Sequence, residues 1–154
     1  MYKNQISIVG AGECSFQIAD WAHEIGNYLA ENGIRIICGG LSGVMHYACK
    51  GAYEAGGETM GILPGPETSA ANQYVTHPIA TDLGQMRNYL VVLNGLFTIA
   101  ISGGYGTLSE VAMACKLGKK VIALGEWDNL PGVEPAKGPE DVFKLVHSLL
   151  PNRT

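Results

Sequence analysis

Short apolar runs alternate with longer runs of helical periodicity over almost the whole chain. Six stretches have the composition of buried strands, the fourth of them weaker: 5–10, 34–38, 58–62, 75–80, 97–101 and 120–124. Five stretches carry apolar side chains at helical spacing: 15–32, 43–55, 84–95, 107–117 and 139–149. This alternation is typical of βαβ units. The sequence therefore predicts a three-layer, Rossmann-like α/β fold, doubly wound around a mostly parallel sheet.

The length of the chain fits a single domain. At 154 residues it can bury one core but not two of ordinary size, so we expect one domain over residues 1–154. Glycines, prolines and acidic residues are spread through residues 125–138, and this composition predicts an irregular loop before the last helix.

Glycine is about twice as common as in an average protein, with 21 residues, and it is concentrated in three turns that follow predicted strands. These turns lie at residues 10–12, 39–43 and 103–106. In a parallel sheet the carboxyl ends of the strands meet at one edge, where ligands bind at the switch in strand order. We therefore expect the three turns to face one crevice.

Among these turns, the last one and the residues around it, 102–110, most resemble an anion-binding site. It joins a predicted buried strand to a helix, and the start of a helix offers unpaired N–H groups and partial positive charge. Glycines let a ligand approach that backbone closely. Thr107 either caps the helix or donates to a phosphate oxygen, whereas Glu110 would repel a nearby phosphate and suits another part of the ligand. The candidate ligand-binding residues here are Ser102, Gly103, Gly104, Tyr105, Gly106 and Thr107.

The first two glycine turns are less specific. Gly10 and Gly12 resemble a dinucleotide fingerprint, but the third glycine is missing and no acidic residue ends the second strand, which argues against NAD. A tight turn with Ser15 as a helix cap, also lining the crevice, is the alternative. The second turn is either structural or contacts a phosphate or ribose. Its candidate residues are Gly39, Gly40, Ser42 and Gly43.

Arg87 is one of three arginines in the chain and begins an apolar helical run. Either it is solvated or paired with Asp82, or it supplies a planar, permanently charged donor to an anion in the crevice. Asn88 would add a neutral amide beside it. We treat Arg87 and Asn88 as candidate site residues.

Several classes of function are disfavoured by what the sequence lacks. A net charge of −4 with few arginines argues against nucleic acid as a partner. No run has the length of a membrane span, and the first residues do not resemble a signal peptide, so we expect a cytoplasmic protein. The histidines and cysteines show no metal-ligand spacing, so no metal site is expected and the four cysteines are predicted to be buried, reduced thiols. A 47% hydrophobic composition makes a buried subunit interface plausible.

Four segments in this order resemble the LOG-like Rossmann family, which includes cytokinin phosphoribohydrolases, molybdenum cofactor carrier proteins and relatives formerly described as possible lysine decarboxylases. The segments are residues 39–45 (GGLSGVM), 61–64 (GILP), Arg87 at a helix start, and 103–110 (GGYGTLSE). The resemblance covers residues 5–125. The hydrolase signature has proline where this chain has Ser102 and lysine where it has Asn88, and these departures are closer to the cofactor-carrier branch.

The resemblance implies a function and a division of roles. It implies a protein that binds a phosphorylated, nucleotide-like small molecule: a nucleoside 5′-monophosphate, or the molybdenum cofactor as a carried ligand. The alternative is a phosphoribohydrolase that cleaves the N-glycosidic bond of a nucleoside 5′-monophosphate, with Arg87 and Glu110 as its catalytic pair. The glycines of residues 103–106 and Thr107 would then hold the 5′-phosphate. Relatives also lead us to expect a homo-oligomer, either a dimer or a tetramer.

Overall fold

A computed structural model describes residues 4–151 and contains one sheet of parallel strands covered by helices on both faces. The strands are β1 (Asn4–Gly10), β2 (Ile34–Cys38), β3 (Thr59–Leu63), β4 (His77–Ala80), β5 (Thr98–Ile101), β6 (Val121–Leu124) and β7 (Val133–Pro135). Their order is β4-β3-β2-β1-β5-β6-β7, and each neighbouring pair is parallel. The predicted doubly wound α/β fold is confirmed.

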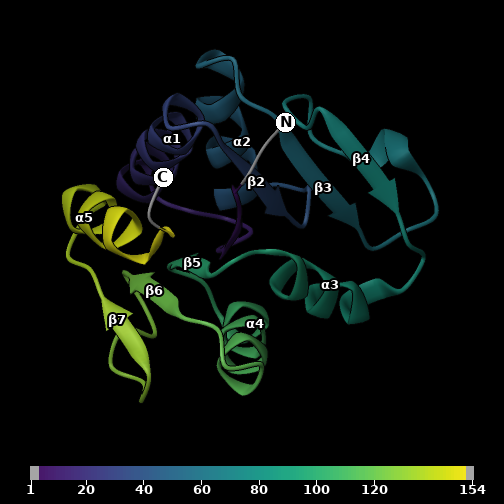
Figure 1. The fold of residues 1–154 in the computed structure, drawn as a ribbon. Helices are drawn as coiled ribbons and strands as arrows, with labels where there is room; N and C mark the ends of the chain where they lie inside the picture. The colour runs from purple at the N-terminus through teal and green to yellow at the C-terminus, as the bar shows by residue number, and fades with distance from the viewer. Residues whose placement is uncertain (1–3, 152–154) are drawn as a thin grey trace.

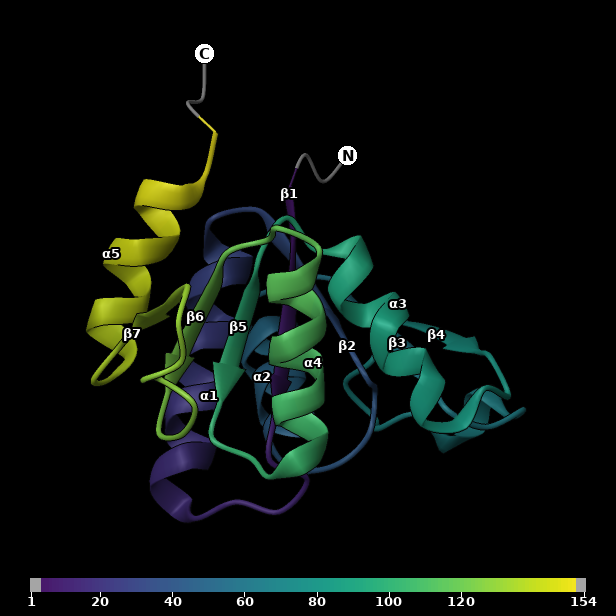
Figure 2. The same cartoon turned by 90° about the horizontal axis from the view of Figure 1, so that it is seen from below.

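The helices form two layers, as Figures 1 and 2 show. α1 (Phe16–Glu31), α2 (Val44–Glu54) and α5 (Pro139–Leu149) cover one face of the sheet, and α3 (Arg87–Asn94) and α4 (Tyr105–Lys116) cover the other. Two short 3-10 turns, η1 (Thr68–Ala70) and η2 (Gly84–Met86), lie before β4 and α3. Among residues 4–151, no helix combines the length and apolar character needed to cross a membrane.

Successive side chains of β1 point to opposite faces of the sheet and so contribute to two separate hydrophobic clusters, one under each helix layer. Ile6 and Ile8 are fully buried against the layer of α1, α2 and α5, whereas Val9 packs in the cluster that includes α3 and α4. Ser7 faces the same side as Val9, and its hydroxyl donates to the carbonyl of Val91 on α3 (2.7 Å). Side chains of successive residues in a strand point to opposite faces, so this central strand is covered by helices on both sides.

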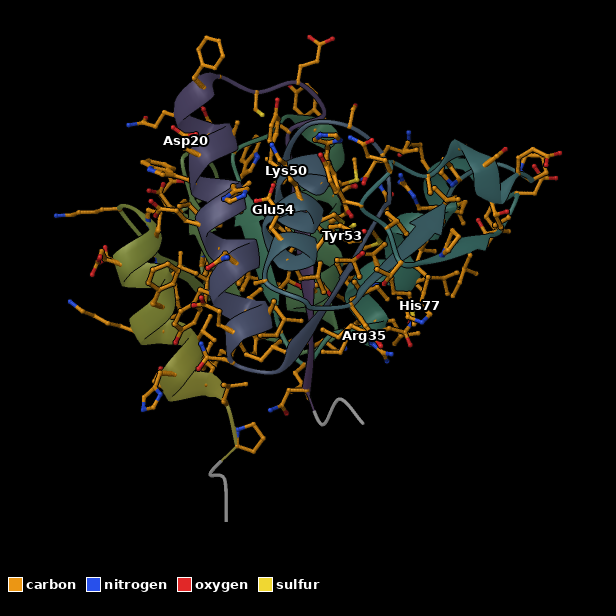
Figure 3. The ribbon with its side chains drawn as sticks, turned by 90° about the horizontal axis from the view of Figure 1, so that it is seen from above. Asp20, Arg35, Lys50, Tyr53, Glu54 and His77 are labelled. Carbon is orange, nitrogen blue, oxygen red and sulfur yellow. The ribbon has the colours of Figure 1, made fainter. Side chains whose placement is uncertain are left out.

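The helices α1 and α2 lie side by side (Figure 3), and at two glycines their backbones approach each other closely. A Cβ atom on Gly26 would lie 2.0 Å from the carbonyl oxygen of Ala48, and one on Gly51 would lie 2.1 Å from that of His23. At the outer surface, His23 Nε2 and Glu54 Oε2 are 2.6 Å apart. Gly26 and Gly51 therefore allow α1 and α2 to pack closely, and this packing determines the position of α2 and of the glycine turn that precedes it.

Some predicted boundaries were wrong. The helix expected over 84–95 begins as the 3-10 turn η2, and α3 starts only at Arg87, because Gly84 has a positive φ of 59° that an α-helix does not accept. The loop expected over 125–138 contains β7, an edge strand whose Pro135 needs no ladder hydrogen bond on its open side.

All four cysteines are free thiols, but only Cys38 and Cys49 are buried as predicted. Their sulfur atoms are 3.6 Å apart. Cys14, in the loop between β1 and α1, and Cys115, in the last turn of α4, are half-buried.

Candidate functional site

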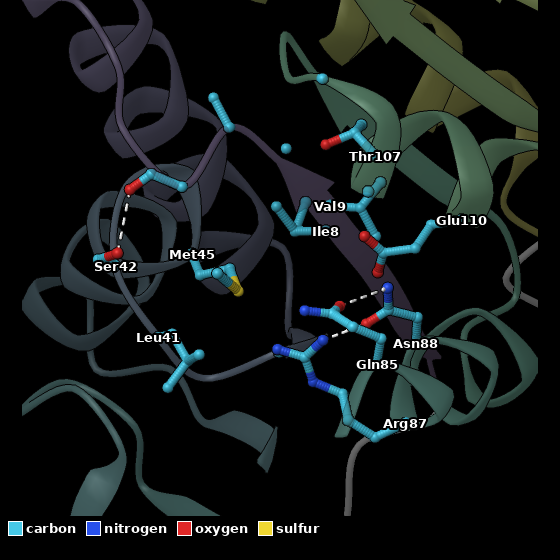
Figure 4. Close-up of a pocket in the computed structure, with 16 residues that line it drawn as sticks. Ile8, Val9, Leu41, Ser42, Met45, Gln85, Arg87, Asn88, Thr107 and Glu110 are labelled. Atoms are coloured by element: carbon cyan, nitrogen blue, oxygen red, sulfur yellow. Dashed lines mark hydrogen bonds between the residues drawn. The ribbon is translucent and has the colours of Figure 1, made fainter. Parts of the chain in front are cut away.

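A pocket of about 280 Å³ opens at the carboxyl ends of β1 and β5, where the strand order reverses (Figure 4). This is the position at which open parallel sheets bind ligands. The residues that line it come from four segments: Ile8, Val9, Gly10, Ala11 and Gly12; Gly39, Leu41, Ser42 and Met45; Gln85, Arg87 and Asn88; and Gly104, Gly106, Thr107 and Glu110. All three predicted glycine turns therefore contribute to one cavity.

The first two turns form one continuous wall. The Ser42 hydroxyl donates to the carbonyl of Gly12 (3.0 Å), and the Val44 amide donates to that of Ala11 (2.9 Å). Gly43 has a φ of 71°, and a Cβ atom there would lie 2.1 Å from the Ala11 oxygen. Only glycine fits this junction, so the backbone of residues 10–12 is held against the start of α2.

Arg87 is the central charged group of the pocket. Its side chain is 6% exposed, although it begins α3 at the edge of the cavity. Nε donates to the carbonyl of Ile62 (2.9 Å), and Nη1 donates to Asn88 Oδ1. Within residues 4–151, no hydrogen-bond acceptor contacts Nη2, and no ion pair joins Arg87 to Asp82. The alternatives of a solvated arginine or an Asp82 partner are therefore wrong.

Asn88 and Gln85 orient this guanidinium. Asn88 is 4% exposed, and while its oxygen accepts from Arg87, its Nδ2 donates to Gln85 Oε1 (3.3 Å). The side chains of Arg87, Asn88 and Gln85 are thus joined by two consecutive hydrogen bonds at the edge of the pocket (Figure 4). Because both donor and acceptor of the Asn88 amide are occupied, the orientation of the arginine is fixed from one side.

Glu110 points into the same pocket from α4, toward the side that holds Arg87 and Asn88 (Figure 4). Burial raises the pKa of its carboxyl group to about 7, and the positive charge of Arg87 opposes that rise. At neutral pH the carboxyl group is thus divided between its neutral and ionised forms. It can donate a hydrogen bond in one form and accept in the other.

The start of α4 supplies unpaired amides. The helix begins at Tyr105, two residues earlier than expected, and its N-cap residue Gly104 makes no side-chain cap hydrogen bond. Thr107 is therefore inside the first turn, so the alternative that it caps the helix is wrong; it is buried, 4% exposed, and lines the pocket. The first-turn N–H groups have no helical partners of their own.

The structure brings ten of the sixteen predicted site residues to the pocket wall and leaves six outside it. Those on the wall are Gly10, Gly12, Gly39, Ser42, Arg87, Asn88, Gly104, Gly106, Thr107 and Glu110; those outside are Ser15, Gly40, Gly43, Ser102, Gly103 and Tyr105. Ser15 caps α1, where its hydroxyl accepts from the Ile18 amide (3.3 Å). Tyr105 is 86% exposed.

Sequence reasoning missed six residues of the lining: Ile8, Val9, Ala11, Leu41, Met45 and Gln85. Ala11 and Leu41 lie inside the predicted glycine turns and could have been included with them. Gln85 precedes Asn88 by three residues, a spacing that in a 3-10 turn places both side chains on the same side, and the two are hydrogen-bonded. Ile8 and Val9 have the appearance of ordinary core residues, and nothing in their sequence context marks them.

No cluster of three or more histidine, cysteine or acidic side chains suited to a metal ion occurs within residues 4–151. The polar groups of the pocket are instead one guanidinium, one carboxyl group, two amides, two hydroxyls and backbone N–H groups. This set suits an organic anion better than a metal ion.

A doubly wound parallel sheet with a glycine-lined pocket at its switch point defines a Rossmann-like ligand-binding domain. The chain belongs to the SLOG cluster4 family, whose model matches residues 3–146, and thereby to the LOG-like Rossmann proteins. It is 39% identical to an uncharacterized protein of Archaeoglobus fulgidus over 94% of this chain and 95% of the relative.

Two solved structures resemble this chain in both fold and sequence. The molybdenum cofactor binding protein of the phototrophic bacterium Rippkaea orientalis is 37% identical, with a TM-score of 0.90 over 97% of this chain and 98% of that one. The molybdenum cofactor carrier protein of Chlamydomonas reinhardtii is 34% identical, with a TM-score of 0.88 over 96% and 98%.

Proposed function

We propose that this chain binds a phosphorylated, nucleotide-like small molecule in the pocket between β1 and β5, as a cytoplasmic protein. The observation that carries the proposal is the guanidinium of Arg87, which is buried in the pocket while its Nη2 has no acceptor among residues 4–151. A buried charge without a full set of partners is costly, and an anionic ligand would complete the set.

The proposed phosphate site is the first turn of α4. Gly104 and Gly106 expose backbone there, and the Thr107 hydroxyl lies on the pocket wall. Backbone N–H groups and a helix N-terminus favour a phosphate, and the hydroxyl adds a donor. Glu110, one turn further along, would then contact the sugar or ring portion of the ligand, since its ionised form repels phosphate.

Melting curves with AMP, GMP and a pterin phosphate test this proposal. We expect at least one to raise the melting temperature by several degrees at millimolar concentration, through preferential binding to the folded state. Thr107→Val removes one hydroxyl without changing the shape of the side chain and should reduce the shift. Ser109→Ala is the matched control, because Ser109 lies outside the pocket and donates to the Gly106 carbonyl. No shift with any of the compounds would refute the proposal.

The first candidate for the physiological ligand is the molybdenum cofactor, carried without turnover. The sequence identity to the Rippkaea orientalis and Chlamydomonas reinhardtii proteins favours this candidate. Protein purified from its own host under anaerobic conditions should contain molybdenum and, after oxidation, release a fluorescent pterin. The absence of both would exclude it as the carried ligand.

The second candidate is hydrolysis of a nucleoside 5′-monophosphate, and it is favoured by Glu110, whose pKa of about 7 suits proton transfer at neutral pH. In this reaction the bond between C1′ and the base breaks and a bond from C1′ to a water oxygen forms. One proton of that water is transferred, overall, to the departing base. A carboxyl group can orient the water and stabilise the oxocarbenium-like transition state.

Incubation with AMP distinguishes the two candidates. Hydrolysis should release adenine and ribose 5-phosphate in equal amounts, and Glu110→Ala should abolish the release while AMP still binds. Product formation at the same rate in Glu110→Ala would contradict the proposed role of the carboxyl group. Binding without product would favour the carrier.

A homo-oligomer is also part of the proposal. Three apolar side chains on or next to α3, Met86, Tyr89 and Leu93, are exposed, with Met86 at 76%. Such exposure is unusual for a small monomer of this composition. Light scattering coupled to size-exclusion chromatography should give the mass of a dimer or tetramer, and the mass of a single chain would refute this part.

A further inference from the structure

Four residues at the ends of the neighbouring strands β5 and β6 have left-handed backbone conformations. They are Ser102 (φ 54°), Gly103 (φ 107°), Gly125 (φ 87°) and Trp127 (φ 62°). The two turns lie against each other, because a Cβ atom on Gly125 would be 3.3 Å from that of Ser102. The turn after β6 therefore packs against the turn that leads from β5 into α4.

A side-chain hydrogen bond joins these two turns. The indole Nε1 of Trp127 donates to the carbonyl oxygen of Gly103 at 3.0 Å. Trp127 is half-buried and is not part of the pocket lining. Its contact with the site thus passes through the backbone of Gly103.

Gly103 in turn packs directly on a pocket residue. A Cβ atom on Gly103 would lie 2.1 Å from Thr107 Oγ1, so the Gly103 backbone is pressed against the threonine side chain. Thr107 is buried and lines the pocket. A rotation of the Gly103 peptide would therefore move the Thr107 hydroxyl or the Gly104 amide.

The left-handed conformation of Trp127 is informative because it is unfavourable. A non-glycine residue is unfavourable in this region, the more so with a bulky side chain, and persists only where surrounding contacts hold it. The hydrogen bond to Gly103 is such a contact. Ser102, which also has a positive φ, is held by its amide, which donates to the Leu124 carbonyl at 2.8 Å. Both turns are thus fixed by contacts across the β5–β6 boundary.

We propose that Trp127 is a positioning residue of the ligand site: its indole holds the Gly103 carbonyl and so fixes the orientation of the Gly104 amide and the Thr107 hydroxyl toward the pocket. This inference rests on the proposed phosphate site at the start of α4. It follows that a ligand bound at Thr107 changes the environment of the indole, although the indole does not touch the ligand.

The chain contains two tryptophans, and this makes the coupling measurable. Trp21 lies on α1, in the other helix layer, and packs against the cluster of α1, α2 and α5. In Trp21→Phe the only remaining tryptophan emission is that of Trp127. Titration with whichever of AMP and GMP gives the larger melting shift should change that emission saturably, and Trp127→Phe, which retains Trp21, should show no change on titration.

Affinity provides the second measurement. Trp127→Phe keeps an aromatic ring but loses the donor, and we expect the dissociation constant, measured by calorimetry, to rise about three- to tenfold. Trp21→Phe is the matched control and should keep the wild-type affinity. A role confined to stability would lower the melting temperature of Trp127→Phe without the emission change in Trp21→Phe.

The outcomes separate this inference from the proposed function. If wild-type protein binds the mononucleotide but Trp127→Phe binds it equally well, or the Trp127 emission does not respond at saturation, the inference is overturned and the proposed function stands. If wild-type protein binds none of AMP, GMP, the pterin phosphate and inorganic phosphate, the proposed phosphate site is refuted and this inference is refuted with it.

Discussion

Gly39 lies directly against the guanidinium of Arg87: a Cβ atom on Gly39 would be 2.7 Å from Nη2 and 3.1 Å from Cζ. The glycine that follows β2 thus provides the space in which the arginine reaches the pocket. The position of the charged group depends on a residue that contributes no side chain to the site.

Gly39→Ala should therefore weaken ligand binding without unfolding the protein. The added methyl group displaces the guanidinium from its bonds to Ile62 and Asn88, and we expect at least a tenfold rise in the dissociation constant for a mononucleotide, measured by calorimetry. Gly12→Ala is the control within the same pocket, because nothing lies within 4 Å of the position that its methyl group would take. Equal affinities of the two variants would contradict this account.

Arg87→Lys tests whether shape or charge matters at this position. Lysine keeps the positive charge, but its three N–H groups are all on one nitrogen atom and cannot replace the separate Nε and Nη1 donors to Ile62 and Asn88 while a further N–H points to the ligand. We expect affinity for a mononucleotide to fall at least tenfold. Arg35→Lys, on β2 and outside the pocket lining, should have little effect. Retained affinity in Arg87→Lys would mean that charge alone suffices.

Glu110→Gln should make the stability of the protein less sensitive to pH. The pKa of Glu110 is about 7 in the folded protein and 4.5 in its ordinary state, so the folded form binds the proton more tightly. The associated stability is fully present below about pH 4.5 and is lost as pH rises to about 7. Since Glu110 is only half-buried, we expect a loss of about 2 kcal/mol or less in wild-type protein.

Urea unfolding at pH 5, 6, 7 and 8 measures this effect. The free energy of unfolding of Glu110→Gln, relative to wild type, should increase from pH 5, flatten as the pH passes through 7 and be constant by about pH 8. The same titration should make anion binding by wild-type protein weaker at pH 8 than at pH 6, and the variant should lack this part of the pH dependence. A difference that is independent of pH would show that the carboxyl group does not titrate in this range.

Lys119→Met should destabilise the fold without changing the pocket. The Lys119 ammonium donates to the carbonyls of Val92 (3.0 Å), Leu93 and Gly95 (2.6 Å), at the carboxyl end of α3. It satisfies orphan carbonyls and complements the helix dipole, so its loss should cost about 1–2 kcal/mol in unfolding free energy. Lys120→Met, whose side chain is exposed, should cost much less. Similar values for the two variants would contradict the capping role.

The fold could be predicted from the sequence because its signals are local. β-branched runs such as residues 34–38, flanked by glycine turns and by helical periodicity, specify buried parallel strands with little ambiguity. The short edge strand β7 could not be predicted in this way. Val133 and Pro135 are ordinary in a loop, and their pairing with β6 depends on a tertiary contact at the open edge of the sheet.

The site could be predicted only in part, for a related reason. Glycine turns and Arg87 are visible in the sequence, and many of them do line one pocket. The indole of Trp127 was not visible, because its hydrogen bond to Gly103 joins residues from two different turns. Tyr105 was included for its place in the motif, yet the first turn of α4 directs its side chain to solvent.

The pairing of β1 with β5 has a consequence for how the pocket is assembled during synthesis. Ser7 pairs with Thr98, about ninety positions later in the chain, and the two walls of the pocket are supplied by residues 8–45 and 85–110. A nascent chain that has left the ribosome only as far as residue 94 still lacks β5 and α4, and with them Gly104, Gly106, Thr107 and Glu110 of the second wall. A ligand that contacts both walls acts as a non-covalent cross-link between the early and late parts of the chain, and it opposes their separation by the free energy of its binding.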